Sequence, residues 1–574
     1  TFGGPLHLPR FGEGGPALIN GKDRLFFFGA YQGIRNPNVT VGTNTGLAIL
    51  ASEFPRLQSA FPGNAVINTI VNYSPFAIAG ATPNTFVPGS PTSGTVAGCG
   101  SQTFLTGGPY DVINLGGQCF QAAQFQRTVS TPYKENYYSA RFDAKPTDRN
   151  NVNFRFLQQK SASVGGAACC STGFIGDLPA GSRNIGGGWT RTLSNTMVNE
   201  FRAAYQKISV EFGGGCDPAT PGCVPGPAQI GAALANISFG GITGVTKTGI
   251  SLATIGPATN LPQGRIGRVY QAADNLSWTV GKHSLLFGGE YKRLLNLVPF
   301  LPTFNGAYTF NSATRLINNA PSAFSLAVGE PLLEFKEDDQ YYYFQDDYRI
   351  RPNLTLNLGV RYEYTGQPIN QLNELSIARE SNATTALFNP SLPLSIRTVP
   401  RVAPDKNNFA PRVGFAYSPR FWKSVLGEDA TVIRGGFSIA YDAAFYNILL
   451  NVMTAAPFAA TLTIPTANLP ATGSPVPLPN NPTGDIVRSI ASSSGVLPRG
   501  VLNPIYLTKT DVAPDFHSPY SEQWSFGLQH QFGRRHVGEV RYVGTHGVDL
   551  FQNINGTFFI GPLVNGFTVT RNGV

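Results

Sequence analysis

The sequence has 574 residues and a formal net charge of +9, yet only 13% of its residues are charged, against about 25% in an ordinary soluble domain. So few charges cannot keep a soluble surface of this size hydrated, and the scattered Lys and Arg residues lack the clustering of a nucleic-acid-binding protein. No run of about 18 consecutive apolar residues is present, which excludes transmembrane helices.

The chain begins with a predicted β-hairpin at residues 1–35, in which "INGKDR" joins residues 2–17 to "LFFFGAYQG". Residues 36–133 are predicted to form one long loop, because they are rich in Gly, Pro, Ser, Asn and Thr. Residues 134–574 are predicted to form six further hairpins with short turns and long loops between them. Their strands are expected at 136–145 and 151–159, 189–191 and 198–206, 268–279 and 284–293, 341–350 and 354–364, 409–417 and 431–442, and 522–532 and 536–543.

The alternation is clearest between Leu354 and Tyr364. Apolar or aromatic side chains occupy every second position, and Asn357, Arg361 and Glu363 stand between them. A period of 2 over about 9–11 residues is typical of a tilted membrane strand, with one face toward lipid and the other toward a watery lumen. Asp346 falls on the apolar face of the preceding strand, but close to the turn, where a modest cost is expected.

The predicted fold class is therefore all-β, a transmembrane antiparallel β-barrel. In hydrocarbon an open sheet edge would leave backbone groups without partners, so the sheet must close. Fourteen strands are predicted here, and they could close alone. The missing signal peptide and abrupt ends favour a larger parent barrel of 22 strands. Short turns are expected in the periplasm and long loops outside the cell.

Charged residues on the polar strand faces allow two interpretations. They could pair with one another in a hydrated lumen wall, which we favour, or they could form a specific ligand site. The residues concerned are Arg141, Asp143, Arg155, Glu200, Arg202, Glu290, Lys292, Arg361, Glu363, Arg434, Asp442, Glu539 and Arg541.

The six cysteines all fall in the predicted long loops. "CDPATPGC" predicts a small disulfide loop between Cys216 and Cys223, because two prolines bend the chain and bring its ends together. Free thiols are the alternative for this pair, and a disulfide would indicate an oxidising compartment. Disulfide bonding is also expected for Cys99 and Cys119. The pairing of Cys169 and Cys170 stays open, because a vicinal disulfide is strained.

Catalytic and metal-binding motifs are weak. "GFSIA" around Ser438 approaches a nucleophile elbow, but it lies in a continuous strand pattern, so Ser438 is expected to be a lumen-facing hydroxyl. "VGKHS" after Val280 lacks the remaining residues of a phosphate-binding loop and is expected to be a turn. The carboxylate groups in "YKEN", "KEDDQ" and "FQDDY" lack the spacing of a calcium loop. We predict no enzyme activity, no metal site and no cofactor.

Several segments, in chain order, resemble barrel strands of TonB-dependent receptors, above all the Oar-like branch. They are "GKDRLFFFGAYQGIR", "YYFQDDYRIRPNLTLNLGVRYEY", "NNFAPRVGFAYSP", "TVIRGGFSIAYD" and "SPYSEQWSFGLQHQF". This resemblance implies a 22-stranded barrel in the bacterial outer membrane, embedded in lipid and closed by a plug. It also implies transport of a solute that the sequence does not identify, driven by the TonB–ExbB–ExbD complex. The signal peptide, regulatory-like domain and plug are expected to be absent from this fragment. A passive porin-like channel or a barrel-based surface adhesin is the alternative.

Overall fold

The structure is a computed structural model, and it describes most of the chain. The described residues are 1–9, 18–19, 21–37, 39–77, 81–84, 92–106, 110–130, 132–164, 177–212, 229–246, 249–427, 429–443, 447–497 and 499–552. Among these residues, none of the helices is both long and apolar enough to cross a bilayer.

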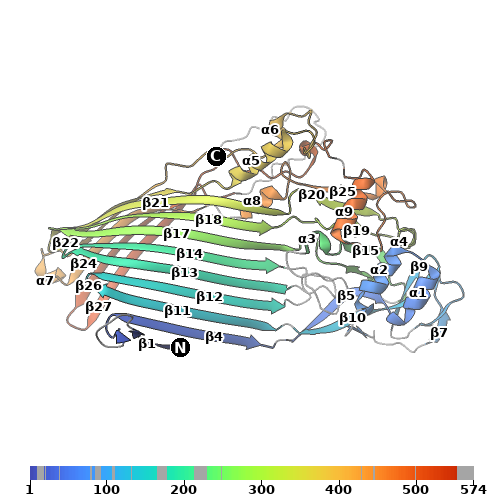
Figure 1. Ribbon diagram of the computed structural model, residues 1–574, viewed down its shortest axis with the longest axis horizontal. Helices are drawn as coiled ribbons and strands as arrows, with labels where there is room; N and C mark the ends of the chain where they lie inside the picture. The colour runs from blue at the N-terminus through green and yellow to red at the C-terminus, as the bar shows by residue number, and fades with distance from the viewer. Residues whose placement is uncertain are drawn as a thin grey trace.

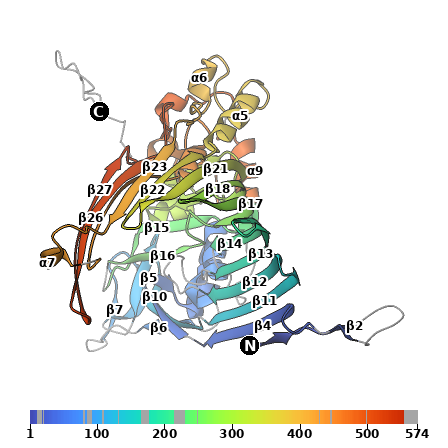
Figure 2. The same ribbon diagram turned by 90° about the vertical axis from the view of Figure 1, so that its left-hand side faces the viewer.

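Fourteen strands form one antiparallel sheet, as the sequence predicts, and each pairs with the next along the chain. In sheet order they are β1 (Phe2–Pro5), β4 (Leu25–Asn36), β11 (Tyr133–Thr147), β12 (Asn150–Val164), β13 (Asp177–Ser194), β14 (Met197–Phe212), β17 (Gln263–Val280), β18 (His283–Pro299), β21 (Leu332–Arg351), β22 (Leu354–Tyr364), β23 (Phe409–Tyr417), β24 (Thr431–Tyr441), β26 (Tyr520–Phe532) and β27 (His536–Val548). The sheet curves strongly, and its edge strands β1 and β27 do not pair with each other within the described residues (Figure 2). The fold is that of a partial barrel.

Several strand predictions need correction, because most strands extend further toward the long-loop end than predicted; β21, for example, begins at Leu332 rather than at residue 341. The first predicted strand and the one at 189–191 differ most. The first predicted strand, 2–17, contributes only β1 to the sheet, while β2 (Leu8–Pro9) and β3 (Leu18–Ile19) pair with each other. The strand predicted at 189–191 extends over the whole of β13. The hydrogen-bonded pairing of the strands continues into the end of the sheet that lies in water. Outward side chains need not be apolar there, so the alternation of apolar and polar residues ends before the strand does.

The register confirms the predicted faces. Residues opposite one another in antiparallel strands share a face. Phe344 lies opposite Phe287 on one side and Val360 on the other, and Val413 lies between Leu358 and Phe437. These large apolar side chains are exposed, as a bilayer-facing surface requires. This apolar face is the outer face of the barrel, and the polar face lines the lumen.

The connections differ at the two ends of the barrel. At the left-hand end of Figure 1 the turns β11–β12, β13–β14, β17–β18, β21–β22 and β26–β27 have two or three residues each. The connection β23–β24 at the same end is longer and contains the short helix α7 (Lys423–Leu426). The connection between β1 and β4, which contains β2 and β3, is also at this end. The remaining long segments lie at the opposite end, hereafter the long-loop end.

The long segments form a second, nine-stranded sheet at this end, which we term the cap (Figure 1). Its strands are β25 (Ala460–Ile464), β20 (Ala323–Val328), β19 (Ala307–Thr309), β15 (Asn236–Thr243), β16 (Ser251–Ile255), β5 (Val39–Ile49), β10 (Gln118–Ser130), β6 (Ala81–Asn84) and β9 (Asp111–Leu115). They come from four separate inter-strand segments. The segment 36–133, predicted to be a loop, therefore holds four strands of a folded unit, and β7 (Thr92–Thr95) pairs with β8 (Thr103–Thr106) beside them.

Helices complete the long-loop end. The helices of the cap are η1 (Ala51–Glu53), α1 (Phe54–Ala60), α2 (Ala65–Tyr73), η2 (Pro75–Ala77), α3 (Gln229–Ala232), α4 (Ala313–Ile317), η5 (Thr466–Asn468) and α9 (Gly484–Ser493). A second group consists of α5 (Ile369–Glu380), α6 (Leu394–Arg397), α8 (Asn447–Met453) and η6 (Pro504–Tyr506). Asn64 caps α2 by accepting hydrogen bonds from the N–H groups of Val66 and Ile67, which begins the helix at that residue.

The cap has its own hydrophobic core. Ile67 of α2, Phe120 of β10, Phe239 of β15, Phe324 of β20 and Val487 of α9 are buried in one cluster. These residues come from all four inter-strand segments, so no single segment could bury them alone. The sequence pattern missed this unit because its apolar runs are short and interrupted by Gly and Pro, and its strand partners are far apart in sequence. Two of its pairings, β15–β19 and β16–β5, are parallel.

Candidate functional site: the lumen wall and the cap

The predicted lumen charges lie where the sequence places them. All except Asp442, which follows the last residue of β24, fall within strands and in register on the polar face. Arg141 lies opposite Arg155, for example, and Arg541 lies opposite Gly527. The structure therefore brings these residues onto one continuous wall, formed by β11 through β27.

Most of these charges pair with the next charge on their own strand. The N–O distances are 2.7 Å for Arg141–Asp143, 2.7 Å for Arg361–Glu363, 2.9 Å for Lys292–Glu290, 3.4 Å for Arg541–Glu539 and 4.0 Å for Arg202–Glu200. Residues two apart on a strand share a face, which makes such pairing geometrically natural. The favoured hypothesis of a self-paired wall is confirmed for these residues.

Tyr341 occupies the centre of the most densely bonded part of this wall. It lies between Glu290 of β18 and Glu363 of β22. Its ring centroid is 4.8 Å from the Lys292 ammonium nitrogen and 4.7 Å from the Arg361 guanidinium carbon. Two cations over one aromatic ring, each paired with a carboxylate, make a rigid polar surface. Tyr341 is not among the residues predicted for the wall, although its odd-numbered position on β21 places it on the polar face.

Between β22 and β27 the wall is more open. Four polar-face positions there are glycines, which have no side chain, and together with Ser438 these glycines border a hollow of about 660 Å³. The glycines are Gly359, Gly414, Gly436 and Gly527. Two arginines project from this sector, Arg412 and Arg434, and neither pairs with a carboxylate among the described residues. This side of the lumen therefore offers space and positive charge, whereas the Tyr341 side is filled and neutralised.

Side chains of the second helix group cover the part of the wall nearest the long-loop end. The face of β21 that carries Tyr341 continues toward the long-loop end with Phe335 and Leu333. Both are buried in a cluster with Leu372 of α5 and Val452 of α8. The polar wall thus becomes an apolar support for the helices at the long-loop end.

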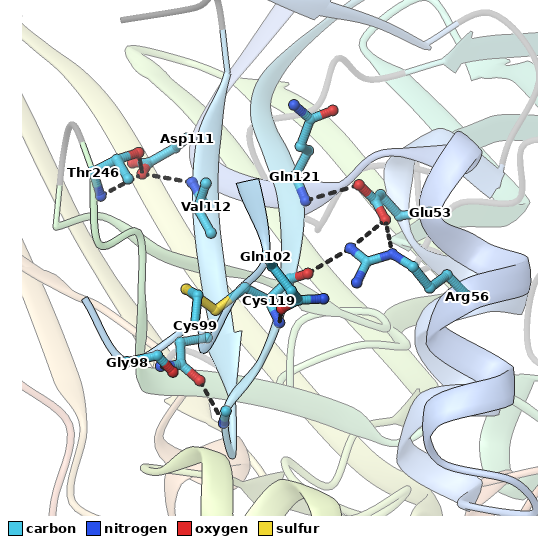
Figure 3. The surroundings of a disulfide bond; sticks show 12 residues. Glu53, Arg56, Gly98, Cys99, Gln102, Asp111, Val112, Cys119, Gln121 and Thr246 are labelled. Carbon is cyan, nitrogen blue, oxygen red and sulfur yellow. Dashed lines mark hydrogen bonds and ion pairs between the residues drawn. A yellow bond between two sulfur atoms is a disulfide. The ribbon is translucent and has the colours of Figure 1, made fainter. Parts of the chain in front are cut away.

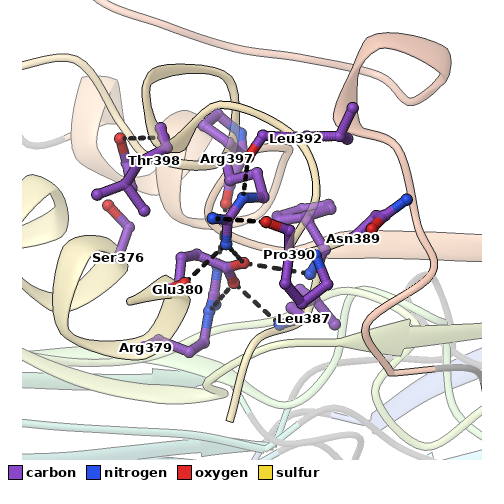
Figure 4. A network of polar contacts seen from close by, with 12 residues as sticks. Ser376, Arg379, Glu380, Leu387, Asn389, Pro390, Leu392, Arg397 and Thr398 are labelled. Atoms are coloured by element: carbon purple, nitrogen blue, oxygen red, sulfur yellow. Dashed lines mark hydrogen bonds and ion pairs between the residues drawn. The ribbon is translucent and has the colours of Figure 1, made fainter. Parts of the chain in front are cut away.

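A buried ionic network holds α5 and α6 together (Figure 4). The Glu380 side chain has 0% exposure, and its carboxylate accepts hydrogen bonds from Arg379 Nε at 2.8 Å and from the Leu387 N–H at 2.9 Å. Arg397 Nη1 lies 3.3 Å from the same carboxylate and also donates to the Glu380 carbonyl at 2.7 Å. A buried carboxylate is tolerated only with such complete pairing. Burial lowers the pKa of Arg379, and Glu380 opposes that shift.

A disulfide closes one corner of the cap (Figure 3). Cys99 and Cys119 are bonded with an S–S distance of 2.03 Å and are buried with Val96 and Val112. The Cys119 N–H donates to the Gln102 side chain at 2.9 Å. The predicted pair Cys216 and Cys223, and the residues Cys169 and Cys170, lie outside the described residues.

A buried carboxylate connects this corner to a second inter-strand segment (Figure 3). Asp111 accepts hydrogen bonds from the N–H and the hydroxyl of Thr246 at 2.9 and 2.7 Å. Residues from the first and the third barrel connection at the long-loop end are therefore fixed to one another, which makes the cap one body rather than a set of independent loops.

The weak catalytic motifs have structural positions. Ser438 lies within β24, on the polar face, opposite Arg412 and Gln523. The residues after Val280 form the β17–β18 turn. In the described part of the chain no three His, Cys, Asp or Glu side chains gather as a metal site requires.

Comparison with known proteins extends over nearly the whole chain. The family described as outer membrane beta barrel domain matches residues 1–571. No curated protein matches the chain. Among solved structures, the outer membrane transporter YddB from Escherichia coli is 13% identical with a TM-score of 0.43, and the similarity covers 73% of this chain and 40% of that one.

Two further solved structures show a similar extent of overlap. The copper transporter OprC is 10% identical with a TM-score of 0.35, covering 73% of this chain and 46% of that chain. The siderophore receptor PirA from Pseudomonas aeruginosa is 9% identical with a TM-score of 0.34, covering 72% and 48%. This chain therefore spans less than half the length of each of these three proteins.

Proposed function

The chain belongs to the family of outer membrane β-barrel domains and lies in the bacterial outer membrane, and we propose from this that it is the barrel of a TonB-dependent receptor. In this proposal the protein belongs to the Oar-like branch and carries a scarce or bulky solute across the membrane. The short turns then lie in the periplasm, and the cap lies outside the cell.

The lumen wall is the observation that carries this proposal. Fourteen strands are still an open sheet, so the complete barrel has a wide interior, and barrels of that size hold an aqueous channel or a plug. Outside the part covered by the second helix group the wall is polar, and most of the predicted lumen charges are neutralised by pairs such as Arg361–Glu363. Such a surface is suited to contact with water, a polar solute or a hydrated plug domain rather than with a packed apolar core.

The cap supports the receptor half of the proposal. Loops that only connect strands need no core, whereas this unit buries large aromatic residues and is fixed by Cys99–Cys119. A rigid surface above the lumen is what recognition of a solute before entry requires. We propose that the solute first contacts the cap and then passes along the lumen wall.

Energy coupling distinguishes this proposal from passive passage. In the proposed mechanism the TonB–ExbB–ExbD complex acts on a plug domain seated against the lumen wall, and the solute passes when that plug moves. A passive porin-like channel would instead conduct ions continuously through its open lumen.

Two measurements on the full-length protein, purified from its outer membrane, test the proposal. The expected results are binding of the periplasmic domain of TonB and no steady conductance in a planar lipid bilayer. Steady conductance without TonB binding would replace the proposal with a passive porin-like channel. The absence of both properties would favour a surface adhesin.

A further inference from the structure

The β23–β24 connection is longer than the five short turns at its end of the barrel. It spans residues 418–430, between Tyr417 and Thr431, whereas β21 and β22 are joined by residues 352–353 alone. The additional length is not needed to reverse the chain, because neighbouring strands of the same sheet reverse with two residues. The extra residues form a projection that contains α7.

Three large apolar side chains on this projection are exposed. Phe421, Trp422 and Val425 have relative exposures of 53%, 74% and 70%. The rings of Phe421 and Trp422 contact each other edge to face, with 5.6 Å between their centroids. Such exposure is unfavourable in water, and these side chains have no core to enter at this site.

The backbone holds these side chains in place at a conformational cost. Trp422 has a φ of +48°, a left-handed conformation that a bulky non-glycine residue rarely adopts. Both nitrogens of the Arg420 fork bond the Asp429 carboxylate, at 3.0 and 3.1 Å, across the base of the projection. Gly427 has a φ of +69°, and a Cβ there would lie 2.5 Å from the Ala430 Cβ. The turn is therefore a defined structure that presents Trp422.

The position of the projection indicates what it contacts. Tyr417, the last residue of β23, lies opposite Leu354 and Ile433 on the apolar outer face. Viewed along the barrel, α7 lies outside the curve of the sheet rather than over the lumen (Figure 2). The exposed residues thus continue the lipid-facing surface at the edge of the membrane. Aromatic residues in barrels concentrate at this boundary.

We propose that the β23–β24 connection is a lipid anchor in which Phe421, Trp422 and Val425 insert into the adjoining leaflet at the membrane–water interface. The basic residue Lys423 lies within this apolar group, and Arg420, which is bonded to Asp429, precedes it. Basic residues beside exposed apolar side chains are typical of segments that lie at the surface of a membrane with anionic lipids. By the proposed orientation this is the periplasmic leaflet. A soluble protein partner fits less well, because a stable interface buries about 1,200 Å² or more, beyond what three side chains of one turn supply.

Depth-dependent fluorescence quenching tests the anchor. The full chain carrying Trp189→Phe, Trp278→Phe and Trp524→Phe retains Trp422 as its single tryptophan. It is reconstituted into vesicles of phosphatidylethanolamine and phosphatidylglycerol whose acyl chains are brominated either near the glycerol or near the methyl end. We expect stronger quenching by the shallow bromines, and severalfold weaker quenching by aqueous acrylamide than for a free tryptophan amide.

A matched variant provides the depth reference. It retains only Trp524, which lies opposite Phe437 on the outer face of the sheet, so deep bromines should quench it more strongly than shallow ones. Trp422 that is quenched fully by acrylamide and by neither brominated lipid would overturn the proposal. Circular dichroism of both variants confirms that the sheet has formed. The result does not depend on TonB or on a solute, so it is separate from the test of transport.

A second measurement follows proteolysis and needs no tryptophan replacements at positions 189, 278 and 524. The variant Phe421→Ser, Trp422→Ser, Val425→Ser removes the apolar group but leaves the Arg420–Asp429 bridge. We expect proteolysis of the connection in vesicles to become severalfold faster than in the parent protein. Equal cleavage rates in the two proteins would contradict insertion.

Discussion

His283 Nδ1 lies 2.8 Å from a carboxylate oxygen of Asp346 on the outer, apolar face of the barrel. The His283 ring also stacks on Tyr348, with 4.2 Å between ring centroids. Both residues lie near the turn at residues 281–282, where β18 begins. The charged residue that breaks the apolar pattern of β21 therefore has a polar partner for one of its two carboxylate oxygens, while the other, Oδ1, is buried without one. The partner on the neighbouring strand lowers the cost of the charge on the outer face.

This pair predicts a strong coupling. His283→Ala should lower the free energy of unfolding by about 1–3 kcal/mol, because it leaves the Asp346 carboxylate without its hydrogen-bond partner on an apolar face. Adding Asp346→Leu should recover much of that loss, since no polar group is then left unpaired. Urea unfolding of the four proteins in lipid gives the double-mutant cycle. Additive effects of the two substitutions would show that the pair contributes nothing.

The Glu380 network predicts a larger effect. Glu380→Gln leaves Arg379 and Arg397 buried without their counter-charge and should cost about 3–5 kcal/mol. The loss should appear as faster hydrogen exchange in α5 and in residues 387–397, because these segments meet at the carboxylate. Glu374→Gln is the matched control, since Glu374 is exposed on the same helix and should change little. Similar exchange in the two variants would contradict the role assigned to Glu380.

The Cys99–Cys119 bond predicts a redox effect confined to the cap. The bridged residues are 20 apart in sequence, and closing a loop of this length stabilises a fold by roughly 3 kcal/mol. Reduction should therefore lower the unfolding temperature of the cap while the barrel strands keep their protection. The double variant Cys99→Ser, Cys119→Ser should resemble the reduced protein and show no response to reductant through this pair. Intact mass before and after reduction also tests the predicted Cys216–Cys223 bridge.

The register predicts a labelling pattern. Cysteines introduced at Leu356 and Phe437 should react only with lipid-soluble thiol reagents, because both positions lie on the outer face within the membrane. Asn357→Cys is the control, one residue along β22 on the polar face. Peptide mapping separates these sites from the native cysteines. Ready labelling of both outer positions by a water-soluble maleimide would show that the assigned faces are reversed.

His517 predicts a local pH dependence. A hydrogen bond to the Asp515 carbonyl and one to the Asp549 carboxylate raise the pKa of His517 above its ordinary value. A group whose pKa is raised by folding stabilises the fold fully below its unfolded pKa, about 6.5, and loses that contribution as pH rises through the folded pKa. Hydrogen exchange near residues 515–518 should therefore accelerate with rising pH beyond its intrinsic increase. His517→Gln should abolish that excess.

The barrel strands and their two faces follow from the amino-acid pattern. Leu354–Tyr364 and Phe409–Tyr417 have the predicted bounds, and the lumen charges lie on the predicted face. The reason is physical: hydrocarbon outside and water inside impose a period of 2 on each strand, and backbone pairing between consecutive strands leaves little freedom of topology. A local pattern was therefore sufficient.

The fold of the long segments and the pairing of buried polar groups depend on contacts between residues far apart in the chain. Phe120 and Phe324 reach one core although about two hundred residues separate them, and no local period records such a contact. The partners of Asp346 and Glu380 were hidden for the same reason. A buried charge is paired by side chains from neighbouring strands or loops. The sequence pattern does not show which of these side chains come within hydrogen-bonding distance of it.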